Sequence, residues 1–434
     1  MEVTDTPSYN SNIQPFHDKW NEIFKKYSIL DEIGDSGQFF ISAKELKEFG
    51  EPRLLAKADS RFERPTIMRE NNLSILPCNS RGSYVIGYFD AYKTIKKNEE
   101  KSRKVLVDEN YDTLDPFSLN KEPAVILSAF NYGIFNHIVQ DDNIRMTDYG
   151  RGSTSEFDYE IKNLKNDGKY DLHVGKSQME VDGVFESVNT VLIVECKNRR
   201  MDDFIIRQLY YPYRTFREKT RKRILNVFLS HSLGTITADV YEFKEEYNYN
   251  SLQLVDRHKL YFHQPIHCED VLKIINSATI LPEPDVPFPQ ANSVDRVVDA
   301  TKMIRDHGYL SAKDLAFCLS VEPRQGDYYG NACRYLGLAE AEPGVTGRVF
   351  KITDKGQKLL DKNPRDQIVL LIELVSQHDV FNRFMQDYLE RGVPQKKSIA
   401  EYLVCNRDLS ESTAERRAET VLSWLHWFMD KIGE

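Results

Sequence analysis

Residues 180–197 read EVDGVFESVNTVLIVECK. The apolar run TVLIVEC in the second half is typical of a buried strand, and Lys197 follows it directly. An acid pair, Glu180 and Asp182, lies one short hairpin upstream. The stretch therefore predicts two paired strands that carry four charges, the fourth being Glu195, at the centre of an otherwise apolar sheet.

Each strand carries its two charges on one face, because side chains alternate between faces along a strand. Pairing the strands through the SVNT turn brings Asp182 near Glu195 and Lys197. Two converging carboxylates repel each other unless a cation lies between them, and hard oxygen ligands select Mg²⁺ or Mn²⁺. A lysine beside them orients or deprotonates a water molecule, or stabilises charge on a phosphate oxygen. The pattern indicates a metal site.

The alternative is a structural hairpin in which Lys197 simply pairs with Glu195 across solvent, because the tripeptide E-x-K is common. Three features favour the metal site. The acid pair precedes E-x-K by the length of a hairpin, and the intervening strand is strongly apolar. A basic, aromatic helix is also predicted directly afterwards, at residues 203–222.

The spacing D-x12-E-x-K, formed by Asp182, Glu195 and Lys197, resembles the motif of the PD-(D/E)XK nuclease superfamily, with Val181 in place of the usual proline. The resemblance implies a core of a helix, a mixed sheet that carries the motif, a second helix and a final strand. That order matches the elements expected in residues 122–265. R-G-x-x-x-x-F at 151–157, together with VECKN and RQLYYPYR, is similar to a group of bacterial type II restriction endonucleases.

The resemblance implies a role for each matching residue. Asp182 and Glu195 would bind Mg²⁺, or Mn²⁺ as a substitute, assisted by the backbone carbonyl of Cys196. Lys197 would be the catalytic lysine, and Glu180 would bind a second metal ion or tune the site. Gln208 would be the glutamine of the helical Gln–Tyr motif found in some branches. The matching tyrosine stays open among three candidates, Tyr210, Tyr211 and Tyr213.

Composition limits the class of protein. The 434 residues predict two to four domains, and no apolar run of 18 residues predicts a membrane span. The six cysteines lack C-x-x-C spacing, which favours reduced thiols in the cytoplasm over a zinc site or a disulfide framework. The net charge of −9 alone weakly disfavours nucleic-acid binding, so any such function depends on local basic stripes.

The predicted fold class is α/β, or more fully multi-domain α+β. A central restriction-endonuclease-like mixed sheet is flanked by helices, with helical and winged-helix DNA-binding domains around it. Four prolines between 282 and 289 predict an interdomain linker. The expected divisions are an N-terminal recognition domain at 1–115, the nuclease domain at 120–279, the linker at 280–293, a winged-helix-like domain at 294–362 and a helical domain at 363–434.

Four stretches supply candidate DNA contacts, although most charge runs are simply solvated faces. The stretch 214–223 is the strongest basic patch and lies next to the motif. In the module 294–360, a third helix from Gln325 to Leu336 would enter the major groove. The candidates are Arg214, Arg217, Arg221, Arg223, Arg53, Lys57, Arg61, Arg324, Gln325, Tyr328, Asn331, Arg416 and Arg417.

These observations predict a Mg²⁺-dependent, sequence-specific endonuclease that cuts double-stranded DNA, of the type II restriction class. Its expected partners are DNA, a cognate DNA methyltransferase of the same system and, for palindromic sites, a second copy of the chain. One alternative keeps the fold and makes the chain a structure-specific repair or recombination nuclease. Another makes it a winged-helix DNA-binding regulator whose nuclease core is inactive.

Overall fold

The structure is a computed structural model of the chain. It describes residues 13–79, 83–96, 103–105, 107, 111, 113–116, 119, 121–262, 266–319, 321–344, 347–407 and 409–433. The protein is mixed α+β, with 44% helix and 29% strand. Its fold divides into two compact units. The sheet unit comprises Ile13–His231 and Thr235–Tyr261, and the helical unit includes Ser232–Gly234 and Phe262–Glu434.

The sheet unit begins with short helices and strands. In chain order they are α1 Ile13–Lys26, α2 Ile29–Ser36, β1 Gln38–Ser42, α3 Ala43–Lys47, α4 Pro52–Leu55, α5 Thr66–Glu70, β2 Ser74–Asn79, β3 Ser83–Gly87, β4 Tyr92–Thr94 and β5 Arg103–Val105. The fully buried Trp20 lies in the apolar core of this region, and its indole nitrogen donates to the carbonyl of Leu55.

The central part of the sheet unit carries the charged hairpin. Its elements are α6 Glu122–Asn131, α7 Ile134–Val139, β6 Arg145–Ser153, β7 Glu156–Lys162, β8 Lys169–Gly175, β9 Gln178–Glu186, β10 Thr190–Lys197, β11 Asp203–Ile205, α8 Arg207–Lys219, β12 Arg223–Ser232, β13 Thr235–Phe243, the 3₁₀ turn Tyr249–Ser251 and β14 Leu252–Phe262. Helices α6 and α7 are separate, because Gly133 adopts a left-handed φ of 69° between them.

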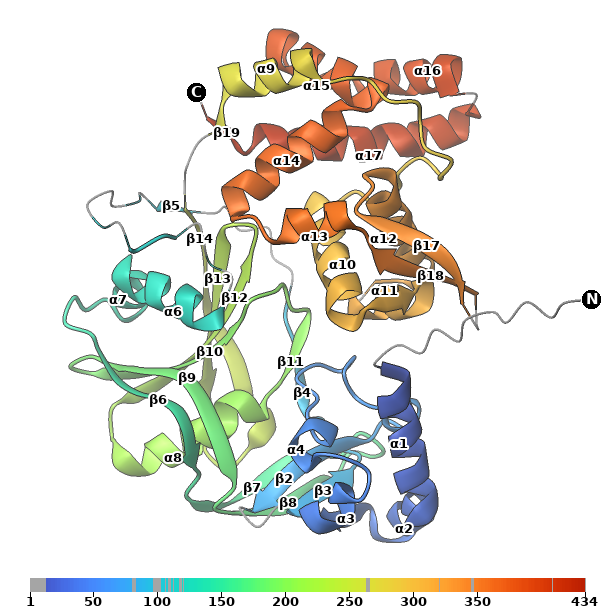
Figure 1. Cartoon of the computed structure of the whole chain (residues 1–434). Helices are drawn as coiled ribbons and strands as arrows, with labels where there is room; N and C mark the ends of the chain where they lie inside the picture. The colour runs from blue at the N-terminus through green and yellow to red at the C-terminus, as the bar shows by residue number, and fades with distance from the viewer. Residues whose placement is uncertain are drawn as a thin grey trace, which may run out of the picture. The chain divides into compact units, whose positions relative to one another are not determined.

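A seven-stranded mixed sheet forms the centre of this unit, with the order β5-β14-β13-β12-β10-β9-β6 (Figure 1). Strand β10 pairs antiparallel with β9 and parallel with β12. The mixed sheet expected from the sequence is therefore confirmed. Strand β7 does not belong to it, because β7 lies in a second sheet with the order β1-β3-β2-β8-β7.

Helices cover both faces of the central sheet, which explains why β10 is apolar at successive positions. On one face, Phe130 and Phe135, from α6 and α7, pack against Phe185 of β9. The opposite face carries Ile193 of β10, which belongs to the same apolar cluster as the α8 residue Leu209. Since Glu195 and Lys197 follow Ile193 at steps of two, they lie on the α8 face.

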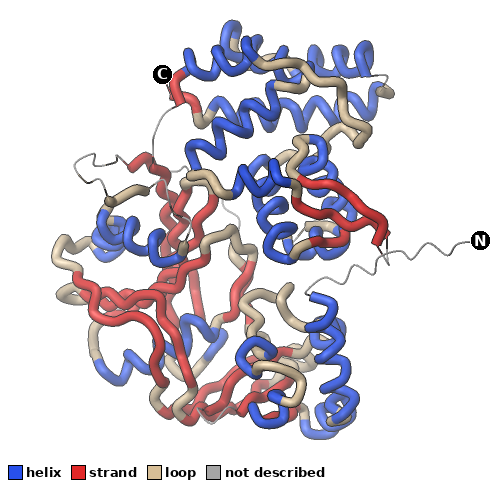
Figure 2. The backbone as a smooth tube through the Cα atoms, viewed as in Figure 1, coloured by secondary structure: helices blue, strands red, loops and turns tan. Residues whose placement is uncertain are grey.

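The helical unit has a three-stranded sheet and a group of longer helices (Figure 2). Its elements are β15 Ile266–His267, α9 Cys268–Ser277, α10 Val294–His307, β16 Tyr309–Ser311, α11 Ala312–Cys318, α12 Pro323–Tyr335, β17 Ala339–Gly344, β18 Gly347–Ile352, α13 Asp354–Leu360, α14 Pro364–Ser376, α15 Asp379–Arg391, α16 Lys396–Arg407, α17 Glu411–Met429 and β19 Ile432–Gly433. The helix expected from Gln325 to Leu336 is confirmed as α12, which is the third of three successive helices, α10, α11 and α12.

The proline-rich segment 280–293 is packed along its length within the helical unit. Leu281 N donates to Gln377 O at 2.9 Å, and Glu283 receives a hydrogen bond from Arg407 at 2.6 Å. Ala291 O accepts from the Trp424 indole at 2.7 Å. The boundary between the two compact units lies near residue 262 instead of at this segment. None of the described helices has the length and apolar character needed to cross a bilayer.

Candidate active site

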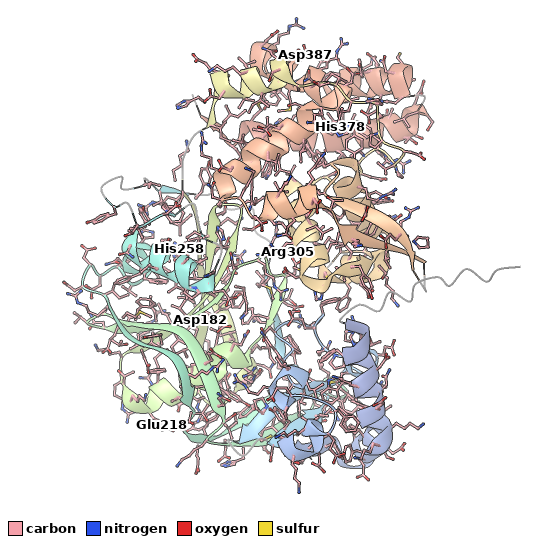
Figure 3. The ribbon with its side chains drawn as sticks, in the orientation of Figure 1. Asp182, Glu218, His258, Arg305, His378 and Asp387 are labelled. Carbon is pink, nitrogen blue, oxygen red and sulfur yellow. The ribbon has the colours of Figure 1, made fainter. Side chains whose placement is uncertain are left out.

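Strands β9 and β10 separate at the charged end of their hairpin. Their pairing runs from Val191 opposite Glu186 to Val194 opposite Gly183, and no further pair follows. Strand β10 nevertheless continues beside β12 as far as Lys197, which lies opposite Ser230. In the absence of a backbone partner from β9, the amide of Cys196 donates to Asp182 Oδ2 at 2.8 Å. Asp182 is thereby fixed at the point where the strands part (Figure 3).

An irregularity in β9 places Asp182 at this point. Between Val184 and Val181, β9 advances three residues while β6 advances two, from Asp148 to Gly150. The extra residue lies at Asp182 or Gly183, as in a β-bulge, which bends a strand and redirects a side chain. Burial raises the pKa of Asp182 above its ordinary value, although the hydrogen bond from Cys196 opposes this effect.

Glu195 is a buried carboxylate beside an aromatic stack. It lies opposite Phe228 of β12, whose ring stacks on Phe204 at a centroid distance of 4.3 Å. The residue is only 6% exposed. Burial raises the pKa of Glu195 to about 8, and the nearby Asp182 adds to the effect. A positive charge at this position would stabilise the ionised form.

Lys197 supplies a positive charge in the metal-free protein. Its Nζ donates to Glu195 Oε1 at 2.6 Å and lies 3.7 Å from Asp59 Oδ2. Burial alone would lower the pKa of Lys197, but the carboxylates of Glu195 and Asp59 outweigh burial and raise it. The structure therefore brings together the three residues of the predicted motif. The ammonium of Lys197 lies between the carboxylates of Glu195 and Asp59.

Asp59 is a residue of this site that the sequence interpretation missed. Its side chain is 9% exposed, and burial alone would raise its pKa. The positive charges of Lys197 and Lys57 outweigh that effect and lower the pKa below its ordinary value. In the sequence, the stretch around Asp59 supplies only candidate DNA contacts, namely Arg53, Lys57 and Arg61. Its one local signal is an acid inside a basic, turn-prone segment, and no spacing rule connects it to a motif far along the chain.

Two further acids lie at different places. Glu122, at the start of α6, is close enough to raise the pKa values of Asp182 and Lys197. Glu180 is half exposed, and its Oε2 lies 3.4 Å from Arg151 Nε and 3.8 Å from Arg53 Nη2. Glu180 also raises the pKa of Asp182, so both acids lie near that carboxylate, but only Glu122 acts on Lys197 as well, and Glu180 is in addition held in an ion-pair network at the surface.

Gln208, in the first turn of α8, has a buried Oε1 without a hydrogen-bond partner. An unpaired buried oxygen costs free energy, so it invites a donor such as a bound water molecule. The nearby tyrosines are occupied. Tyr210 OH donates to Glu246 O and Tyr211 OH to Pro77 O, both at 2.8 Å. The position of the motif tyrosine therefore stays open.

The donor set fits a hard divalent cation held partly by water. Among the described residues, no three His, Cys, Asp or Glu side chains are arranged to hold a metal ion. Mg²⁺ usually needs only one or two carboxylates, because it retains several water ligands. Asp182 and Glu195 satisfy that requirement, and burial raises the pKa of Glu195 even though Lys197 lies beside it, so a further positive charge would stabilise the ionised carboxylate. These two residues would hold the ion, with the Cys196 carbonyl as the expected third ligand.

The basic stretch after the motif is divided between core and surface. Arg214 is 5% exposed, its Nη1 donates to Asp158 O at 2.8 Å, and its guanidinium lies over the Phe157 ring. Arg214 therefore packs in the core. Its guanidinium is not accessible to DNA, which argues against the predicted DNA contact. The guanidinium of Arg217 donates hydrogen bonds to the backbone carbonyls of Thr220 and Lys222. Arg221 and Arg223 are exposed, with Arg223 Nε 2.9 Å from Glu242.

The three candidates of the N-terminal region have different surroundings. Arg53 is exposed on α4 and pairs weakly with Glu180. Lys57 is 62% exposed at its side chain and lies 3.5 Å from Asp59 Oδ2. Arg61 instead fastens the loop, because its guanidinium donates to Tyr92 O and Thr94 Oγ1, each at 2.8 Å. Arg53 and Lys57 thus remain available at the surface, whereas Arg61 serves the fold.

The candidates of the helical unit also divide. Arg324 is exposed in the first turn of α12, and Tyr328 is half-buried. Gln325 accepts from Glu322 N at 3.1 Å in a capping box, whereas Asn331 is buried and accepts from Arg334 at 3.0 Å. On α17, Arg416 is exposed. Arg417 has two buried guanidinium nitrogens without partners, and its pKa is lowered by burial and by Arg416.

Comparison with known families divides the chain into three matched regions. Each matching family model is described as a domain of unknown function: DUF6996 over residues 17–86, DUF6997 over 87–261 and DUF7226 over 296–433. No curated protein and no solved structure matches the chain. Asp182, Glu195 and Lys197 fall within the second matched region, and Asp59 falls within the first. The candidate site is therefore assembled from two regions that are matched separately.

Proposed function

We propose that the chain is a divalent-cation-dependent endonuclease that hydrolyses phosphodiester bonds in double-stranded DNA at a specific sequence, as a type II restriction enzyme does. The observation that carries the proposal is the grouping of Asp182, Glu195 and Lys197 where β9 and β10 separate. The Lys197 Nζ lies 2.6 Å from Glu195 Oε1. The carboxylate of Asp182 accepts a hydrogen bond from the amide of Cys196, the residue between Glu195 and Lys197 in the sequence. Two carboxylates and one ammonium in this arrangement suit hydrolysis of a phosphodiester.

The roles of the residues follow from their charges and positions. Asp182 and Glu195 hold Mg²⁺, for which Mn²⁺ substitutes. The ion, when bound, lowers the pKa of a water molecule and neutralises charge on the phosphate. Lys197 is buried and fully charged, so its ammonium stabilises the negative charge that develops on a phosphate oxygen. Gln208 directs a buried carbonyl oxygen that is free to orient water.

The order of elements supports a restriction-endonuclease-like core. Helix α6 precedes the β9–β10 hairpin that carries the motif, and helix α8 follows it. Strand β12 then pairs parallel with β10 along its length. This is the order that the resemblance to the PD-(D/E)XK superfamily implies. Fold-level likeness alone does not specify a reaction, so the proposal depends on the three side chains.

The order of elements in the helical unit supports DNA as the substrate, because it suits a winged-helix DNA reader. Helices α10, α11 and α12 are followed by the β17–β18 hairpin, and β16 completes a three-stranded sheet with the order β16-β18-β17. In this interpretation α12 enters the major groove and presents Arg324 first. The same unit favours the second candidate, a DNA-binding regulator with an inactive core. The retained Asp182, Glu195 and Lys197 argue against that candidate.

The biological setting follows from the proposed activity. A sequence-specific nuclease requires protection of the host sites, so we expect a cognate DNA methyltransferase in the same system and a cytoplasmic location. With one candidate site among the described residues of the chain, two copies would act on the two strands of a palindromic sequence. These expectations are secondary to cleavage itself.

Digestion of a supercoiled plasmid tests the proposal. The protein is expected to produce discrete linear fragments with Mg²⁺ and none with EDTA, while Glu195→Gln produces none under either condition. Glu160→Gln is the matched control, because Glu160 is an exposed carboxylate paired with Lys169 and should cut normally. Cleavage restricted to junctions or ends would favour the repair nuclease. Binding to DNA without cleavage at any Mg²⁺ or Mn²⁺ concentration would favour the regulator.

A further inference from the structure

Four charged side chains alternate in sign from the surface to the buried site. Lys57 Nζ is 3.5 Å from Asp59 Oδ2, which is 3.7 Å from Lys197 Nζ, and that atom is 2.6 Å from Glu195 Oε1. The Lys57 side chain is 62% exposed, whereas the side chains of Asp59, Lys197 and Glu195 are all buried, at 9%, 12% and 8%. Asp59 therefore links a solvent-accessible lysine to the buried lysine of the site.

We propose that Asp59 is a positioning residue that holds the ammonium of Lys197 when the carboxylate of Glu195 binds the divalent cation. This inference rests on the proposed function, because it requires a cation at Glu195. The ammonium and the cation compete for the same carboxylate. A buried ammonium that loses its partner needs a second one, since an unpaired buried charge is strongly destabilising.

The geometry suits this exchange of partners. At 3.7 Å, Asp59 Oδ2 lies just beyond hydrogen-bond distance of Lys197. A movement of the ammonium by about 1 Å would make that contact a hydrogen bond of ordinary length. The same movement would take the positive charge away from Glu195. Asp59 thus provides a place for the ammonium next to the cation, where it remains close to a phosphate bound there.

The loop around Asp59 is fixed by contacts that do not use its carboxylate. Asp59 N donates to Glu63 Oε2 at 2.8 Å, and Asp59 O accepts from Ile205 N at 2.9 Å. The hydroxyl of Tyr92 donates to Ala58 O at 3.0 Å, and Glu63 also pairs with Arg199. Replacing the Asp59 side chain by an amide therefore leaves the loop anchored, so a change in cation binding reports on charge.

Calorimetric titration with Mn²⁺, in the absence of DNA, tests the proposal. In Asp59→Asn, Lys197 remains on Glu195 and one attractive charge is lost, so we expect Mn²⁺ affinity to fall on the order of tenfold. Asp59→Glu restores a carboxylate and should recover much of the affinity. Glu51→Gln is the matched control, because it makes the same carboxylate-to-amide change at an exposed position just before α4, away from the contacts that fix the loop of Asp59.

A double-substitution cycle shows whether Asp59 acts through Lys197. In a Lys197→Met background, Asp59→Asn should change Mn²⁺ affinity much less than in the native background. With DNA as substrate, Asp59→Asn should lower kcat more than it raises KM. Unchanged Mn²⁺ affinity in Asp59→Asn, or an equal loss in Glu51→Gln, would overturn the role of Asp59 and leave the proposed function standing. Failure of the unsubstituted protein to bind Mn²⁺ would overturn both.

Discussion

The carboxylate of Asp182 accepts a hydrogen bond from the amide of Cys196 over 2.8 Å, in the place where a strand-to-strand backbone bond would otherwise form. This contact has two separable components. The carboxylate oxygen of Asp182 accepts the hydrogen bond that holds the end of β10, and the negative charge of the same carboxylate is available to a cation. An amide reproduces the first component and not the second, so substitutions at Asp182 distinguish structure from chemistry.

We expect Asp182→Asn to lose Mg²⁺-dependent cleavage by at least about 100-fold while remaining as stable as the native protein within about 0.5 kcal/mol. Asp182→Ala should lose cleavage similarly and also about 1–2 kcal/mol of stability, because the Cys196 amide loses its acceptor. Cleavage rates and urea unfolding in EDTA measure the two effects. Native cleavage by Asp182→Asn would show that its charge has no role in a metal site.

Glu195 should make the stability of the metal-free protein depend on pH. Burial raises its pKa in the folded state to about 8 from an ordinary value of 4.5. Between these values the folded protein retains a proton that the unfolded chain has released. The stabilising contribution is therefore complete below about pH 4.5 and is lost as the pH rises through about 8.

The comparison with Glu195→Gln isolates this effect from other titrating groups. We expect the free energy of unfolding of the native protein to fall relative to the variant as pH rises from about 5 to 8, by at most about 1.4 kcal/mol per pH unit. Urea unfolding in EDTA at several pH values measures the difference. A constant difference across that range would contradict the buried environment of Glu195.

The sequence predicted the local part of the site well. The hairpin, its apolar strand and the following helix depend on periodicities within about 40 residues, and the structure has them as β9, β10 and α8. The proximity of Asp182, Glu195 and Lys197 followed from the same local geometry. The separation of β9 from β10 did not, because it arises from an irregularity in pairing with β6.

Long-range packing decided what the sequence could not predict. Asp59 reaches Lys197 from a separate region, through a loop fixed by contacts with Glu63 and Ile205. Arg214 belongs to a basic run, but its position on α8 turns it toward the rings of Phe157 and Tyr210. A charge run states only the composition of a segment. Which of its members face solvent depends on the elements packed against it.

Arg214 and Arg221 offer a matched pair from that basic run. Arg214→Met should cost about 1–3 kcal/mol of stability, because Asp158 O loses a buried donor and the aromatic rings lose a cation. Arg221→Ala, at an exposed position, should leave stability unchanged and weaken DNA binding. Thermal unfolding and fluorescence anisotropy with duplex DNA separate the two. Weaker binding by a fully folded Arg214→Met would contradict its placement in the core.

Arg324 tests the proposed reader in the helical unit. It is exposed in the first turn of α12, whereas Asn331 on the same helix is buried against Arg334. If α12 lies in the major groove, Arg324→Ala should weaken binding to the cognate duplex. A phosphate contact would reduce the slope of log affinity against log salt concentration by about 0.9 and weaken all sequences alike. Loss of a base contact would instead weaken binding to the cognate sequence only, by about 1–3 kcal/mol.

Lys362→Ala, at an exposed position just after α13, is the control and should bind normally. Equal binding by Arg324→Ala and the control on every duplex would exclude the N-terminal turn of α12 from the DNA interface.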